Sequence, residues 1–193
     1  MNSLYVDLIA VALIVINLLL GWKFGILGRA LSLGGLYGGV AAATAMSDRL
    51  LRFFGGGGAA NDLYASAWTY VGVVFGVVAM VEILGALYRE RVEKVISLMF
   101  DRTSGVVAGL VVGVLQAAIV VMVVLAVGDA TTTAPTQKLP SQHADTSSAV
   151  RNSLFGSHIA GLDPAVKAFF GPALPANLSG YLADTTSAAT ASR

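Results

Sequence analysis

Four long apolar stretches, separated by short polar segments, dominate the pattern of hydrophobic and polar positions along the chain. A helix of about 20 apolar residues crosses a hydrocarbon core of about 30 Å. The pattern therefore predicts an all-α polytopic membrane protein with four transmembrane helices, over about residues 4–20, 26–45, 65–87 and 105–127. We take residues 1–128 as its transmembrane domain.

The composition agrees with a membrane protein. Of 193 residues, 56% are hydrophobic and 12% are charged, and the mean hydropathy is +0.77, whereas soluble domains are about 25% charged. The absence of cysteine excludes disulfides and thiolate metal sites. A formal net charge of +1 with scattered Lys and Arg excludes a basic nucleic-acid surface. We expect no metal, no cofactor and no nucleic-acid partner.

The segments outside the four stretches have their own patterns. Residues 88–99 place apolar side chains on one helical face and charged side chains on the others, which predicts a short amphipathic helix in the membrane interface. The composition changes after Gly128, and all five prolines of the chain follow. We expect an extracytoplasmic tail over residues 129–193, partly ordered over 153–170 in one or two short docked helices and disordered over 183–193.

Glycine recurs at every fourth position in three of the predicted spans. Residues four apart lie on one helical face, and small residues there let another helix backbone approach closely in lipid. We expect the second helix, which is rich in glycine and alanine, to be central in the bundle. The expected packing residues are Gly34, Gly38, Gly72, Gly76, Gly105, Gly109 and Gly113.

Basic residues beside the spans predict the orientation. Most of them flank the first and third connections, which the positive-inside rule places in the cytoplasm. Both termini are then expected outside. These residues are Lys23, Arg29, Arg89, Arg91, Lys94 and Arg102, against Arg49 and Arg52 in the second connection and Lys138 after the fourth span.

Glu82 is the one carboxylate deep inside a predicted span. A functional interpretation is a proton or cation site that faces Asn17 or Gln116. The structural interpretation, which we favour, is a carboxyl kept neutral by burial or an ion pair, because charges inside membranes are usually paired or neutralised. The candidate partners are Arg29, Lys23 and Arg89.

Other polar residues near the membrane surfaces have structural alternatives too. Asp7 is expected to cap a helix or to pair with Arg49 or Arg52. Asp101 and Arg102 can bind each other, cap the fourth helix or meet lipid phosphate.

The tail contains serine and histidine residues that could suggest a catalytic triad. They are Ser141, His143 and Asp145, and separately Ser157 with His158. A catalytic triad needs side chains that a rigid fold holds in position, and this segment has little regular structure. We therefore expect no catalysis.

The fourth span carries the motif Asp101-Arg102-x-x-Gly105-x-x-x-Gly109-x-x-x-Gly113. Together with Asp7, the Gly21-x-x-x-Gly25 turn and the segment from Ser153-Leu154 onward, it resembles the colicin V production protein (CvpA) family. The resemblance implies a bacterial inner-membrane protein associated with toxin export and envelope homeostasis, with no established enzymatic activity. Some relatives carry a serine protease domain after the fourth span; we expect no such activity here.

Two functions follow as hypotheses. The first is a non-enzymatic scaffold, or an assembly or accessory factor, in toxin export or envelope homeostasis, which contacts membrane lipid and a membrane-protein partner or a second copy. The alternative is a subunit of a small oligomeric transporter or channel that uses Glu82, Asn17 and Gln116.

Overall fold

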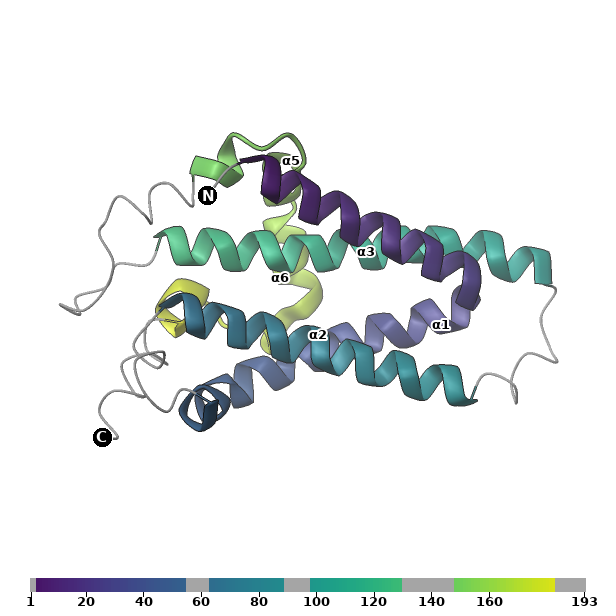
Figure 1. Ribbon diagram of the computed structural model, residues 1–193, viewed down its shortest axis with the longest axis horizontal. Coiled ribbons are helices and arrows are strands. Elements are labelled where there is room, and N and C mark those ends of the chain that lie inside the picture. Colours follow the sequence, from purple (N-terminus) through teal and green to yellow (C-terminus); the bar gives the residue numbers. More distant parts are fainter. Residues whose placement is uncertain (1–2, 55–62, 89–97, 130–147, 183–193) are drawn as a thin grey trace.

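A sharp reversal at Gly25 divides the longest helix of the computed structural model into two arms. The helix, α1, is Ser3–Phe54, and its backbone leaves the helical conformation at Gly25, where φ is 69°. Glycine adopts this left-handed region without steric cost. A Cβ at Gly25 would also overlap the Asp101 carboxylate. We call residues 3–24 the first arm and residues 26–54 the second arm; Figure 1 shows the chain folding back between them.

The structure describes residues 3–54, 63–88, 98–129 and 148–182. Besides α1, these contain α2 (Leu63–Tyr88), α3 (Leu98–Asp129), α5 (Leu154–Ala160), α6 (Asp163–Phe170) and the short 3-10 helix η3 (Gly171–Ala173). No strand occurs in these ranges, and the all-α class is confirmed. Most of the expected amphipathic helix, from 89 to 97, and the expected disordered end, from 183, lie outside the described residues.

Within the described residues, three helices are long and apolar enough to cross a membrane: Ser3–Met46, Leu63–Leu87 and Asp101–Gly128. The first of these contains the reversal and both of the first two predicted spans. Four crossings therefore remain a prediction, which depends on each arm of α1 crossing separately.

The central helix is α3, so the expectation that the second span is central is wrong. In the most apolar stretch of α3, 61% of the residues are buried. In the second predicted span, 26–45, seven of the 20 residues are buried: Arg29, Ser32, Gly35, Leu36, Gly39, Val40 and Ala43. The reason is that α3 is covered from several sides. It makes the most extensive contact of the bundle with α1, and the tail helices α5 and α6 also pack on it, whereas α2 contacts it little. Figure 1 shows the tail crossing α3 from the beginning of α1 toward its second arm.

The glycines of α3 lie against the backbone of the first arm. A Cβ at Gly105 would overlap the carbonyl oxygen of Gly21, and a Cβ at Gly113 would lie 2.8 Å from the Cα of Ile14. A Cβ at Gly109 would overlap the carbonyl oxygen of Asn17. The two backbones are thus in contact along three turns, as small residues allow in membrane helices.

The other four expected packing glycines face away from the described helices. A Cβ at Gly34, Gly38, Gly72 or Gly76 would have no heavy atom of the described structure within 4 Å. The neighbouring pair in the second arm makes the contact with α2 instead: a Cβ at Gly39 would lie 2.8 Å from the carbonyl oxygen of Val74, and one at Gly35 would lie 3.1 Å from Val81.

The tail packs on the bundle over a longer range than the expected residues 153–170. Phe170 is fully buried and stacks on Tyr37 with ring centroids 6.1 Å apart. The Thr44 hydroxyl donates to the carbonyl of Ala173 at 2.8 Å, and the Tyr181 hydroxyl donates to the carbonyl of Thr44 at 2.6 Å. These contacts tie residues beyond 170 to the second arm.

A methyl group added at Gly109 is expected to destabilise the protein by about 1–3 kcal/mol, because the backbone of the first arm leaves no room for it. Thermal unfolding of Gly109→Ala in detergent measures this. The matched control is Gly38→Ala, where the Cβ enters open space and better helix propensity should stabilise by up to about 1 kcal/mol. Equal effects of the two variants would contradict the close contact.

Candidate functional site: a buried polar cluster and two capping carboxylates

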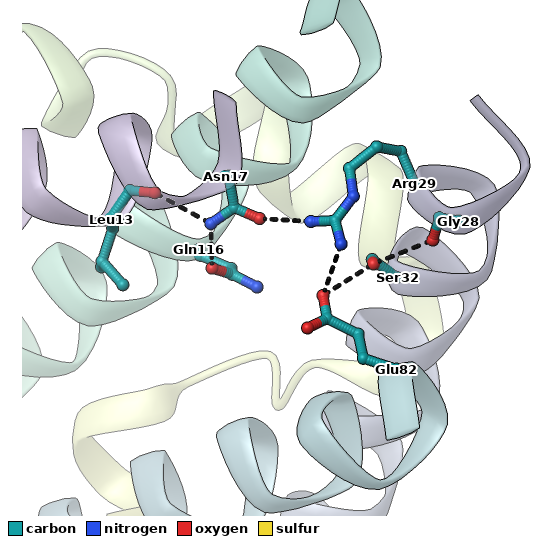
Figure 2. A network of polar contacts seen from close by, with 7 residues as sticks. All are labelled: Leu13, Asn17, Gly28, Arg29, Ser32, Glu82 and Gln116. Atoms are coloured by element: carbon teal, nitrogen blue, oxygen red, sulfur yellow. Dashed lines mark hydrogen bonds and ion pairs between the residues drawn. The ribbon is translucent and has the colours of Figure 1, made fainter. Parts of the chain in front are cut away.

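A cluster of polar side chains lies inside the helix bundle, where the sequence is otherwise apolar. It joins both arms of α1 to α2 and α3 (Figure 2). We call it the polar cluster, and it consists of Asn17, Arg29, Ser32, Glu82 and Gln116.

Arg29 is the centre of the polar cluster. Its side chain is 1% exposed; Nη1 donates to Asn17 Oδ1 at 2.9 Å, and Nη2 donates to Glu82 Oε1 at 3.0 Å. Its Nε is buried without a hydrogen-bond partner in the described structure. This position differs from the expected one beside a cytoplasmic connection, because the reversal at Gly25 turns Arg29 into the bundle one helical turn later.

Asn17 connects Arg29 to α3. Its Nδ2 donates to Gln116 Oε1 at 2.7 Å and to the carbonyl of Leu13, one turn earlier, at 2.8 Å. Asn17 and Gln116 are 2% and 4% exposed. Asn17 is hydrogen-bonded through both atoms of its amide group and Gln116 through its Oε1, which offsets the cost of burying them.

Glu82 pairs with Arg29, which was one of the three cations expected for it. Its Oε1 also lies 2.7 Å from the Ser32 hydroxyl, which can donate there or to the carbonyl of Gly28 at 3.0 Å. Glu82 remains 23% exposed. Asn17 and Gln116 belong to the same cluster, but they reach Glu82 only through Arg29.

Asp7 caps a helix of the tail. Its Oδ1 accepts hydrogen bonds from the Ser153 hydroxyl at 2.6 Å and from the Phe155 amide at 2.7 Å, and its Oδ2 accepts from the Leu154 amide at 3.2 Å. Ser153 in turn accepts from the Gly156 amide at 2.7 Å. The first amides of α5 are thus satisfied by a carboxylate from the beginning of α1, which fixes the tail to the first arm.

Asp101 acts in the same way at the other end of the bundle. Its Oδ1 accepts from the Ile26 amide at 2.9 Å, so it caps the second arm and not its own helix, which begins at Leu98. The neighbouring Arg102 guanidinium lies 5.9 Å from the centre of the Trp22 ring, a cation–π distance. The motif therefore holds the reversal of α1 in place.

The described residues contain no group of three or more His, Asp and Glu side chains that could hold a metal ion. Ser157 and His158 are neighbours on α5, and each bonds the Leu154 carbonyl, at 3.1 Å and 2.7 Å. The triad candidates Ser141, His143 and Asp145 lie outside the described residues. The polar groups that the structure brings together hold helices to one another.

Apolar helices of membrane-spanning length around internal polar contacts define a membrane protein. The family model "Colicin V production protein" matches residues 6–164, from the beginning of α1 to the beginning of α6. The chain belongs to this family. No curated protein and no solved structure gives a significant match.

Sequence analysis missed three polar residues with structural roles. Ser32 lies three residues after Arg29 on the same helical face, a spacing that could have linked the two. Thr44 and Tyr181 connect the second arm to the end of the tail, and no local pattern indicates a contact between residues so far apart in the chain.

Removing one charge of the Arg29–Glu82 pair should destabilise the protein more than removing both. Arg29→Gln leaves a carboxylate without its cation, a loss of about 3–5 kcal/mol for a buried pair. The double variant with Glu82→Gln should be more stable than the sum of the two single losses predicts, by a coupling free energy of about 1–3 kcal/mol. Unfolding of the two single variants and the double variant in detergent measures the coupling.

The matched control is the exposed pair on α6, Lys167 and Asp163, whose Nζ–Oδ2 distance is 2.7 Å. Its coupling should stay below about 0.5 kcal/mol, because solvent screens it. A coupling at Arg29–Glu82 no larger than this would contradict the structural role of the polar cluster.

Replacing Asp7 should release α5 from the first arm. Asp7→Ala removes three hydrogen bonds, so hydrogen exchange at Leu154 and Phe155 should accelerate by about tenfold or more if their loss costs over 1.4 kcal/mol. The control Asp163→Ala removes a carboxylate of the tail itself, whose partner there is the exposed Lys167. Equal exchange in both variants would show that Asp7 does not hold the tail.

Proposed function

We propose that this protein is a non-enzymatic scaffold of the bacterial inner membrane, an assembly or accessory factor in toxin export or envelope homeostasis. The observation that carries the proposal is the tail. It is held to the bundle by Asp7 and Thr44, yet it leaves large apolar side chains exposed. These are Leu154 at 75%, Phe155 at 49%, Leu162 at 40% and Phe169 at 48%. Exposed apolar groups on an anchored segment are typical of a surface that docks a partner.

The proposed arrangement has four crossings with both termini outside. The reversal at Gly25 supports two crossings by α1, because its arms run in opposite directions. Near the reversal, Lys23 lies over the Phe24 ring and Arg102 over the Trp22 ring. Basic and aromatic side chains together suit a cytoplasmic interface. The beginning of α1 and the tail are then extracytoplasmic.

The outward glycine faces support contact with another membrane helix. Gly34 and Gly38 on the second arm, and Gly72 and Gly76 on α2, offer open space beside the backbone. In lipid, such faces suit a membrane-protein partner or a second copy of this chain.

The contacts of Glu82 favour the scaffold over the transporter alternative. Arg29 does not release its proton in proteins, and its guanidinium occupies the space between Glu82 and Asn17. A cation moving along these residues would have to displace that fixed positive charge. The geometry therefore supports a structural polar cluster.

The test uses photo-crosslinking in native membranes. A photoreactive residue at Phe155 or Phe169, both about half exposed, should capture one defined membrane or extracytoplasmic protein. The same probe at the buried positions Ile159 and Val166 should not capture it. Leu154→Ser with Phe155→Ser should abolish capture from Phe169 and cause loss of the export or envelope phenotype at normal protein level.

The control variant is Ser157→Ala, an exposed polar change on the same helix. Capture that is unchanged in the Leu154→Ser, Phe155→Ser variant would overturn the docking role of the tail. Flux through proteoliposomes that disappears with Glu82→Gln would favour the transporter instead.

A further inference from the structure

An apolar hollow of about 150 Å³ lies between the first arm, α2 and α3. One buried alanine from each of these helices lines it: Ala10, Ala67 and Ala117, which are 2%, 7% and 1% exposed. Their small side chains leave space that larger residues would fill. Among the lining residues, Trp68 and Ile9 are 72% and 40% exposed, so the hollow opens to the outside of the bundle where they lie.

The hollow lies at one end of the bundle. Its walls come from the beginning of α1 (residues 6–10), the beginning of α2 (64–71) and the end of α3 (117–127). All three ranges are inside the helices that can cross a membrane. Figure 1 places these three helix ends on the same side as the N-terminus. The hollow is therefore at the level of the leaflet on that side.

The walls of the hollow are apolar. Apart from Tyr64 and Trp68, every side chain that lines it is Val, Ile or Ala, which is typical of a surface in contact with lipid. A dry apolar cavity of about this size accepts apolar ligands and excludes water. Tyr64 and Trp68 line the hollow one turn apart at the beginning of α2, and these residue types occur at the level of lipid headgroups.

We propose that the hollow binds one acyl chain of a phospholipid from the leaflet on the N-terminal side. The headgroup lies near Tyr64 and Trp68, and the chain extends between α2 and α3, where these helices have few contacts of their own. The bound chain supplies the packing that the two helices lack. The inference rests on the membrane embedding in the proposed function, but not on the scaffold role.

The experiment uses the full chain in vesicles of phosphatidylethanolamine and phosphatidylglycerol that contain a phospholipid with a diazirine in one acyl chain. Mass spectrometry measures labelling at the wall residues Val120 and Val124 and at Val107, an exposed residue of the same helix outside the hollow. Ala67→Leu fills the hollow and should lower labelling of Val120 and Val124 by about fivefold or more. Labelling of Val107 should stay constant.

Ala10→Leu fills the hollow from a second helix and should have the same effect, so the test does not depend on the folding of one variant. Ala79→Leu, an exposed alanine of α2 outside the hollow, is the matched control and should leave all labelling unchanged. Labelling of Val120 and Val124 that neither filling variant lowers would overturn the proposal. Capture of a second copy by a photoreactive residue at Trp68 would also overturn it.

Failure here leaves the scaffold proposal intact, because the tail surface and the hollow use different residues. Leu154→Ser with Phe155→Ser should leave lipid labelling unchanged, since neither residue lines the hollow. Conversely, if Ala67→Leu lowers lipid labelling in the hollow but leaves crosslinking of the partner from Phe155 unchanged, both proposals are supported.

Discussion

The contact between α3 and the reversed helix α1 is the constraint on which the other contacts depend. Three glycines of α3 let its backbone touch that of the first arm, and Asp101 caps the second arm immediately after the reversal at Gly25. Lipid gives apolar helices no hydrophobic reason to associate, so close backbone packing must supply the stability. Larger side chains in place of the three glycines of α3 would also separate Asn17 from Gln116 and break the hydrogen bond that joins α3 to the polar cluster.

The polar cluster explains how a carboxylate is tolerated inside an apolar helix. Glu82 accepts from Arg29 and Ser32, and Arg29 also donates to Asn17, so the two charges are paired and each has a further polar partner. The helices α1, α2 and α3 each contribute at least one member, so the cluster fixes how these mostly apolar helices are positioned relative to one another. This arrangement supports the proposed scaffold more than a pathway for ions.

Two aspartates perform the same task at opposite ends of the bundle. Asp101 caps the second arm, and Asp7 caps α5, each satisfying backbone amides of an element distant in the chain. A carboxylate near helix amides is favourable because the orphan N–H groups and the helix dipole both attract negative charge. The tail is thereby anchored, while Leu154 and Phe155 beside the cap stay exposed. The family of colicin V production proteins thus includes a chain whose tail and bundle are joined by a specific polar contact.

The all-α class, the apolar segments that become helices and the family could be predicted from the sequence, because helix length, hydropathy and glycine spacing are local properties. The sequence also singled out Glu82, Asp7 and Asp101 as unusual, since a carboxylate near or inside an apolar run is conspicuous. Their partners became apparent in the folded chain: Glu82 with Arg29, Asp7 with α5, and Asp101 with Ile26. The fold also shows that α3 is central and that Gly35 and Gly39, not Gly34 and Gly38, contact α2. These choices depend on the rotation of each helix about its axis and on where the tail returns, which no local pattern of residues specifies.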